Sequence, residues 1–251
     1  MFPLVDLHVH SIASGHAFNT IDEIVNYAIL HEYKIIGISD HGPDMEGAPH
    51  AGYFEMLYRL PHNCDKTIIM YGCEANILDV DGKIDLSNHL IATLDYVIAG
   101  LHKRTSYTGW SIEENTLAIE ALIESQKADI VSHPISMSYM IDSEKIINCA
   151  AKNNVILECN VSVVREAILQ NRLDVLDAMV DLYDKAIKNN VNIILGSDAH
   201  HVSEMELNIE DINLIENTLK LQYSKMLNYY PDKLYDILKQ RKSIRRRMFY
   251  D

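Results

Sequence analysis

Short apolar runs alternate with longer amphipathic stretches along most of the chain. The runs have the length and β-branched content of buried strands, whereas the longer stretches repeat their apolar residues at helical spacing. The runs predict strands at about 5–10, 35–40, 67–73, 96–101, 129–132, 155–160 and 192–196. The stretches predict helices at 20–32, near 53–60, and at about 112–126, 143–153 and 172–189, with a helical region from about 203 onward.

Two local signals add detail to this pattern. Thr20 and Glu23 have the spacing of a capping box, which predicts that the first helix begins directly after Thr20. Asp81-Gly82 is a turn signal between two short apolar pieces. We therefore expect a hairpin at 79–83, inserted after the third strand.

The alternation of strands with helices favours one α/β domain. Strands that are joined through helices pair in parallel, and seven of them favour a closed barrel similar to the TIM barrel over an open sheet. No stretch of the chain has the Pro-, Gly- or Ser-rich composition of a linker. We therefore predict a single seven-stranded (β/α)7 barrel domain that spans residues 1–251.

A histidine or a carboxylate stands at the carboxyl end of nearly every predicted strand. In parallel strands these ends meet at one face, where barrel enzymes have their active sites. Neutral imidazole and carboxylate groups are the usual ligands of zinc and related ions. The pattern therefore predicts a polynuclear metal site built from His8, His10, His41, Glu74, His102, His133, Asp198 and His200.

The spacing of these residues strengthens the metal-site interpretation. His8 and His10 are two residues apart, so in a strand both side chains lie on one face. Asp198 and His200 repeat this spacing on the last strand, which lies beside the first when a barrel closes. Glu74 is the sole carboxylate at the end of the third strand. We expect it to bridge two ions, because a carboxylate has two oxygens to offer.

Composition narrows the choice of partners. A formal net charge of -14 argues against general binding to nucleic acid, whose phosphates attract basic surfaces. The chain has no apolar run of the roughly 20 residues that a membrane span needs, and its start does not resemble a secretory signal. We expect a cytoplasmic protein with four reduced cysteines. Contact with nucleic acid is one interpretation of the basic segment 239–247. The acidic balance elsewhere favours the other, the end of a last helix, where cations complement the helix dipole.

The motifs resemble those of the PHP (polymerase and histidinol phosphatase) superfamily, and among its members the YcdX-like single-domain phosphatases. The resemblance rests on blocks that span residues 5–200 in order. They are AspLeuHis8ValHis10Ser, SerGlyHis16, SerAsp40His41GlyPro, AlaProHis50, GlyCysGlu74AlaAsn, AspGlyLysIleAsp85, AlaGlyLeuHis102, SerHis133Pro and GlySerAsp198AlaHis200.

The resemblance implies a distorted seven-stranded barrel that holds three divalent metal ions, usually zinc, although manganese and iron also suit these donors. It implies hydrolysis of phosphate monoesters by a metal-activated hydroxide. It also implies an allotment of ligands: His8, His10, Glu74 and Asp198 to one ion, Glu74, His102 and His133 to a second, and His16, His41 and His200 to a third.

Further roles follow for residues around this site. Besides Glu74 and Asp198, we expect Asp40 to serve catalysis as a group that orients ligands, with His50 beside it. The cations Lys103, Arg104 and Arg165, together with His50, are candidates for binding a small phosphorylated substrate. Ordinary surface charge is the alternative for these three cations. The sequence leaves open whether the protein forms a homo-oligomer.

The chain departs from the family pattern in two places. The sixth strand ends in Glu158-Cys-Asn160-Val-Ser162, where the family has a run of asparagine and serine, and little after Ser203 matches. We expect these differences to affect the wall and rim of the pocket and to leave the metal site untouched.

Two other functions compete with a phosphatase. The same superfamily includes exonuclease domains, so a phosphodiesterase or an exonuclease that acts on nucleic acid fragments is one alternative. A metal-binding protein without catalytic activity is the other. The complete set of candidate ligands favours an enzyme over the second alternative.

Overall fold

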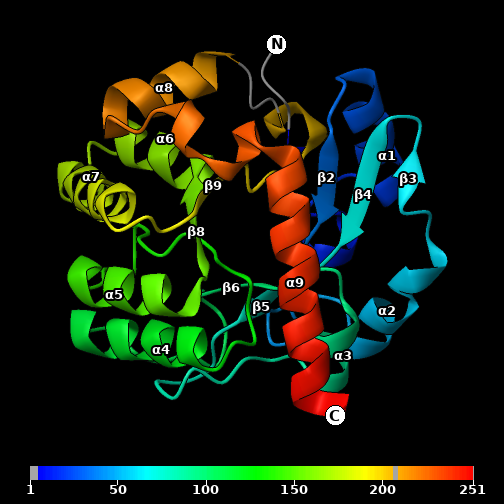
Figure 1. Cartoon of the computed structure of the whole chain (residues 1–251), viewed down its shortest axis with the longest axis horizontal. Coiled ribbons are helices and arrows are strands. Elements are labelled where there is room, and N and C mark those ends of the chain that lie inside the picture. Colours follow the sequence, from blue (N-terminus) through cyan, green and yellow to red (C-terminus); the bar gives the residue numbers. More distant parts are fainter. Residues whose placement is uncertain (1–4, 206–208, 251) are drawn as a thin grey trace.

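The computed structural model describes residues 5–205 and 209–250, in which strands alternate with helices (Figure 1). A first sheet has the order β1 (Val5–Asp6), β2 (Ile35–Ile38), β4 (Thr67–Tyr71) and β3 (Asn63–Cys64), and only β3 is antiparallel to its neighbour. A second sheet is entirely parallel and consists of β5 (Glu74–Asn76), β6 (Ile98–Gly100), β7 (Ile130–Val131), β8 (Ile156–Asn160) and β9 (Ile193–Gly196).

The predicted strand 67–73 corresponds to β4, which ends at Tyr71 in the first sheet. The chain then passes Gly72 and enters the second sheet as β5, beyond the predicted strand. A Cβ atom at Gly72 would lie 2.7 Å from the ring of Tyr96, so only glycine allows this ring to pack against the crossing. Isolated parallel bridges join Val9 to Ala199 and His41 to Glu74, so both ends of the second sheet contact the first.

Most predicted helices are present at their expected places. They are α1 (Ile21–Leu30), α2 (Ala51–Met56), α4 (Ile112–Glu124), α5 (Ser143–Asn153) and α7 (Leu173–Lys188). The capping box is confirmed, because Thr20 accepts from the backbone N–H of Glu23 while the Glu23 carboxylate accepts from that of Thr20. The turn at Asp81-Gly82 is also confirmed, by a bridge between Ile77 and Ile84.

The sequence pattern missed two helices. These are α3 (Asn88–Thr93), which is short, and α6 (Val161–Leu169), which follows β8 without a loop because Asn160 caps it. The carboxyl-terminal part contains α8 (Ile209–Leu219) and α9 (Pro231–Tyr250), while residues 206–208 of the predicted helical region lie outside the described residues. None of the described helices is long and apolar enough to span a membrane.

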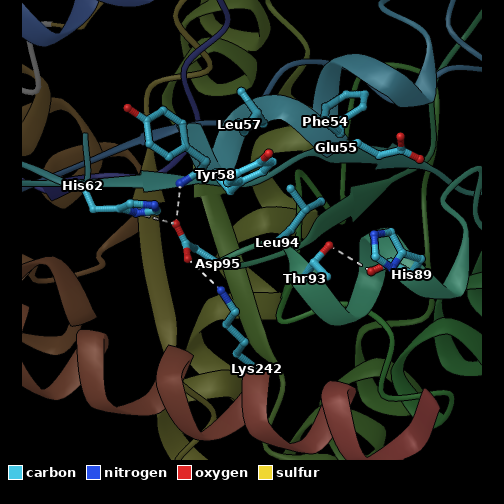
Figure 2. A pocket seen from close by; sticks show the side chains of 11 residues that line it. Phe54, Glu55, Leu57, Tyr58, His62, His89, Thr93, Leu94, Asp95 and Lys242 are labelled. Carbon is cyan, nitrogen blue, oxygen red and sulfur yellow. Dashed lines mark hydrogen bonds and ion pairs between the residues drawn. The ribbon is translucent and has the colours of Figure 1, made fainter. Parts of the chain in front are cut away.

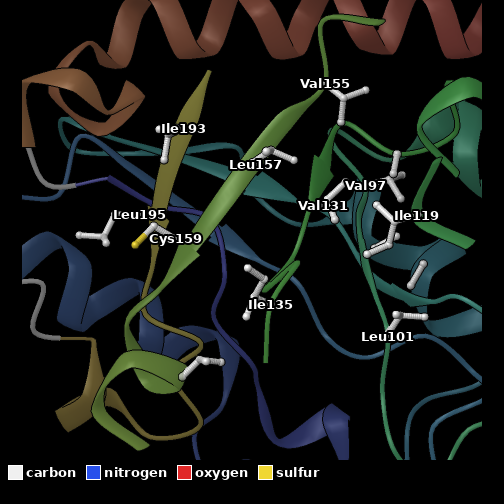
Figure 3. Close-up of a cluster of buried hydrophobic side chains, with 14 of the residues drawn as sticks. Val97, Leu101, Ile119, Val131, Ile135, Val155, Leu157, Cys159, Ile193 and Leu195 are labelled. Carbon is white, nitrogen blue, oxygen red and sulfur yellow. The ribbon is translucent and has the colours of Figure 1, made fainter. Parts of the chain in front are cut away.

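Alternate residues of each strand point to opposite faces, and the two faces belong to two different apolar clusters. One draws Val5, Ile35, Met70, Ile98, Ile130, Ile156 and Ile194 from both sheets and is closed by Leu234 and Leu238 of α9. In the other, alternate residues of the second sheet, such as Leu157 and Leu195, pack with helix residues such as Ile119 (Figure 3). The strands are therefore buried on both faces, as parallel strands covered by helices are.

Helix α9 packs beside α3 and places two buried arginines next to one buried carboxylate (Figure 1). Arg241 Nε lies 3.0 Å from Asp129 Oδ1, and the guanidinium of Arg245 pairs with Oδ2. Both arginines also donate to backbone carbonyls, including those of Ala128 and Leu94. Asp129 directly precedes β7, so this cluster lies at the amino ends of the strands. The basic segment thus does more than complement the dipole of its own helix.

We predict that Asp129→Asn destabilises the protein by about 3–5 kcal/mol, because two buried guanidinium groups lose the one carboxylate partner that they have among the described residues. Urea unfolding followed by circular dichroism measures this change. Arg246→Ala is the matched control, since Arg246 is exposed on the same helix, and it should change stability by about 0.5 kcal/mol or less. Equal effects of the two substitutions would contradict the prediction.

Candidate metal centre

The residues at the strand ends come together on one face. His8 and His10 follow β1, and His41 follows β2. Glu74 opens β5 after the crossing from β4, and His102, His133, Asp198 and His200 follow β6, β7 and β9. Three groups of these residues place their ligand atoms within 4.8 Å of one another: His8, His10, Glu74 and Asp198; His41, Glu74 and His102; and His10, His41 and His200.

Glu74 lies at the centre and is fully buried. Its Oε2 atom lies 3.1 Å from Nε2 of His8 and 3.0 Å from Nδ1 of His41. Its Oε1 atom lies 3.1 Å from Nε2 of His102 and 2.9 Å from Nε2 of His133. The two oxygens of one carboxylate therefore face two different sets of histidines.

Asp198 is the second carboxylate of the cluster. Its Oδ1 atom lies 3.4 Å from Nε2 of His8 and 3.2 Å from Nε2 of His10. Two donors bound to one tetrahedral ion at about 2.0–2.1 Å are separated by roughly 3.3 Å. The spacing of these atoms therefore suits an ion between them.

Hydrogen bonds fix which nitrogen of His8 carries the proton when the ring is neutral. Nδ1 lies 2.6 Å from the carboxylate of Glu158, which can only accept. The Nε2 lone pair then faces the carboxylates of Glu74 and Asp198, and Nε2 has no hydrogen-bond partner in the part of the chain that the structure describes. A lone pair aimed at two carboxylates is unfavourable unless a cation lies between them.

His10 has the same arrangement through a serine. The Ser14 hydroxyl donates to Asp40 at 2.7 Å, so its oxygen can only accept from Nδ1 of His10 at 3.1 Å. The Nε2 lone pair of His10 therefore also faces Glu74 and Asp198. Asp40 additionally accepts from Ser11 and Tyr53. It thus lies behind His10, to which Ser14 connects it, and outside the three groups.

The pKa shifts of Glu74 and His8 also indicate that the cluster favours positive charge. Burial alone would raise the pKa of Glu74, but His8 and His102 hold it well below its usual value. Burial alone would lower the pKa of His8, but the carboxylates of Glu158, Glu74 and Asp198 raise it well above the usual value. Protons and metal ions therefore compete for the same lone pairs, and the residues present fit a group of divalent cations.

His16 is less closely integrated than the other candidates. It is exposed and belongs to none of the three groups. Its ring stacks at 4.9 Å from those of His41 and His200. His200 donates from Nδ1 to the carbonyl of Asp198. In the neutral ring, Nε2 therefore carries the lone pair, on the other side of the ring from this hydrogen bond.

The four predicted substrate-binding residues lie in different surroundings. Lys103 lines a cavity of about 260 Å³ together with His102, His133 and Asp198. Arg104 is exposed next to it. Arg165 is paired with Asp211 at 2.5 Å, and the ring of His50 caps α2 by accepting from the backbone N–H of Gly52. The geometry thus supports Lys103 most directly, because Arg165 and His50 already have other partners.

One expectation about the departures from the family pattern is wrong. Glu158 and Asn160 do not line the rim but are buried against the ligands. Ser14 is a second residue that the strand-end pattern missed. The signal for Glu158 was its place in a strand that is apolar on both faces, where a carboxylate needs buried partners.

A larger cavity of about 360 Å³ lies elsewhere, between α2, α3 and α9 (Figure 2). Among the residues that line it, Asp95 already pairs with His62 and Lys242. His62 and His89 also line it. None of the candidate site residues lines this cavity.

Comparisons with known proteins agree with the motifs. The model of the PHP domain matches residues 6–162. The chain is 33% identical over 238 residues to a probable phosphatase of Clostridium novyi, covering 95% of each protein. It is 35% identical over 241 residues to the probable phosphatase YcdX of Escherichia coli K12, covering 96% of each.

The fold has solved relatives as well. A histidinol phosphate phosphatase from Lactococcus lactis, complexed with zinc, L-histidinol and phosphate, matches with a TM-score of 0.61. The match covers 88% of this chain and 94% of that one, at 16% sequence identity. At this identity the comparison establishes a shared fold.

We predict that Ser14→Ala destabilises the metal-free protein by about 1–3 kcal/mol, because Asp40, His10 and the backbone N–H of His41 each lose a buried hydrogen-bond partner. Urea unfolding in the presence of a chelator measures it. Ser162→Ala on the exposed face of α6 is the control and should have little effect. Equal stability of Ser14→Ala and the parent protein would show that the hydrogen bonds of Ser14 to Asp40, His10 and His41 do not stabilise the fold.

Proposed function

Because the chain belongs to the PHP domain family, we propose that it is a metal-dependent hydrolase of phosphate monoesters. Its curated relatives are named probable phosphatases and cover nearly its whole length, which supports a phosphatase. We further propose that the two sheets form a distorted barrel within one domain, with a trinuclear metal centre at the carboxyl ends of the strands. The barrel has the seven predicted strands when β4 and β5 are counted as one and the antiparallel β3 is left out.

The position of Glu74 carries this proposal. Its carboxylate is fully buried, and its two oxygens face separate sets of histidines at 2.9–3.4 Å. A buried carboxylate with imidazole nitrogens facing both of its oxygens suits the bridge between two cations.

We propose the ligand allotment that the family pattern implies. His8, His10, Glu74 and Asp198 would hold one ion, and Glu74, His102 and His133 a second. His16, His41 and His200 would hold the third; the ring of His16 stacks on those of His41 and His200, which supports their common role. Zinc is the first choice for this mixture of imidazole and carboxylate, while manganese or iron would also suit it.

The chemistry then divides between the ions and the chain. When bound, the ions supply a nucleophile at neutral pH by lowering the pKa of water to about 7, and they neutralise charge on the phosphoryl group. Asp40 and Ser14 hold His10 in the tautomer that ligation needs. Lys103, at the cavity beside His102 and His133, would bind an outer phosphate oxygen of a small substrate.

We expect Glu74→Ala to lower kcat/KM on p-nitrophenyl phosphate by more than about 100-fold, because even residues behind a metal ligand contribute about 10–100-fold. The assay uses protein of measured metal content. His62→Ala is the matched control, since His62 lies in the unrelated cavity at Asp95, and it should retain activity.

The same assay decides between the functions. Protein loaded with metal should hydrolyse the monoester faster than bis(p-nitrophenyl) phosphate or a short single-stranded oligonucleotide. Activity on the diester or the oligonucleotide alone would indicate a phosphodiesterase or nuclease. Inactivity on all three substrates would indicate a metal-binding protein without catalysis.

A further inference from the structure

A buried carboxylate outside the ligand set contacts the candidate metal centre from behind. Glu158 lies in β8 and is 1% exposed. It shares a face of the strand with Ile156 and Asn160, because alternate residues of a strand lie on the same side. An ionised group buried this deeply is costly unless it is paired and hydrogen-bonded, so its partners indicate its role.

Both oxygens of Glu158 accept from residues that belong to the candidate ligands. Oε1 lies 2.6 Å from Nδ1 of His8. Oε2 accepts from the backbone N–H of His133 at 2.9 Å. The backbone of His133 has φ = +26°, which is rare for a residue with a side chain. The bond to Glu158 therefore holds His133 in a conformation that it would not readily adopt alone.

A third ligand is connected through Asn160. The Nδ2 group of Asn160 donates to Oε2 of Glu158 at 3.1 Å and to Oδ2 of Asp198 at 3.2 Å. The remaining carboxylate oxygen of Asp198, Oδ1, faces His8 and His10. The amide thus turns one oxygen of Asp198 away from the cluster and leaves the other directed into it.

The neighbouring strand makes room for this carboxylate. A Cβ atom at Gly196 in β9 would lie 2.1 Å from Oε1 of Glu158 and 3.1 Å from Cβ of His8. Any side chain at position 196 would displace Glu158 from His8. The glycine is therefore part of the same arrangement.

We propose that Glu158 is a positioning residue that orients three metal ligands: His8 directly, His133 through its backbone and Asp198 through Asn160. The inference rests on the proposed metal centre and adds a residue that determines its affinity. One carboxylate would thereby orient ligands of two of the proposed ions. Groups that hold ligands in this way typically contribute 10–100-fold to metal affinity.

The test compares zinc affinity in the parent protein and in Glu158→Gln, by competition with a chromophoric chelator. Glutamine keeps the size of the side chain but replaces one accepting oxygen with an NH₂ group, which would oppose an N–H of either His8 or His133. We expect zinc affinity to fall about 10–100-fold. Glu124→Gln, on the exposed end of α4, is the control and should bind zinc like the parent.

Gly196→Ala provides a second variant that leaves every ligand and Glu158 itself chemically unchanged. We expect it to weaken zinc binding in the same direction, because the added Cβ displaces the carboxylate. Circular dichroism and urea unfolding of the zinc-free proteins establish that each variant is folded. A merely structural role predicts loss of stability in the zinc-free state with no change in zinc affinity, and that result would overturn the proposal.

The outcomes separate this inference from the proposed function. If the parent protein binds zinc tightly and both variants bind it equally well, Glu158 does not position the ligands, while the metal centre stands. If the parent protein itself fails to bind zinc, manganese or iron, the metal centre is wrong and the role of Glu158 falls with it. Weaker binding in both folded variants supports the proposal.

Discussion

The rest of the site depends on the burial of Glu74, a carboxylate with no exposed surface and with imidazole rings around both of its oxygens. A buried anion without compensating charge costs many kcal/mol. The hydrogen bonds of His8 and His10 direct their protons away from it, to Glu158 and Ser14. Under the proposed function added cations complete the cluster, and these residues are arranged for binding rather than for the stability of the fold.

At the amino ends of the strands, a second buried carboxylate has its cationic partners within the chain. Asp129 is as deeply buried as Glu74, but Arg241 and Arg245 of α9 neutralise it, and backbone carbonyls accept their remaining N–H groups. Between the two ends lies an apolar cluster that is contributed by both sheets. At the amino ends, the chain itself thus supplies the cations for its buried carboxylate. At the carboxyl ends, bound metal ions would supply them under the proposed function. Stability and function are thereby separated along the strands.

The strand-end residues were predictable because a parallel α/β topology brings any carboxyl end to the same face, whatever the exact strand boundaries. The change of sheet between β4 and β5 was not predictable, since it depends on the packing of Tyr96 against Gly72. Ser14 and Asp129 were missed for a similar reason. Their partners, His10 and Arg245, are defined by tertiary contacts that no spacing along the chain reveals.

The sequence drew attention to Glu158 but did not predict where its side chain lies. Its position within an apolar strand marked it as unusual, but a departure from a family pattern says nothing about which side of the strand faces the site. The structure places it behind His8, where it adds a third carboxylate to Glu74 and Asp198.

This count bears on substrate binding under the proposed function. Three carboxylates around the cluster would repel a phosphate group, whereas bound divalent cations reverse the local sign. The acidic balance of the whole chain, at -14, is then no obstacle to an anionic substrate. Affinity for phosphate should be created by the metal ions themselves, so that a substrate is held only where it can also be hydrolysed.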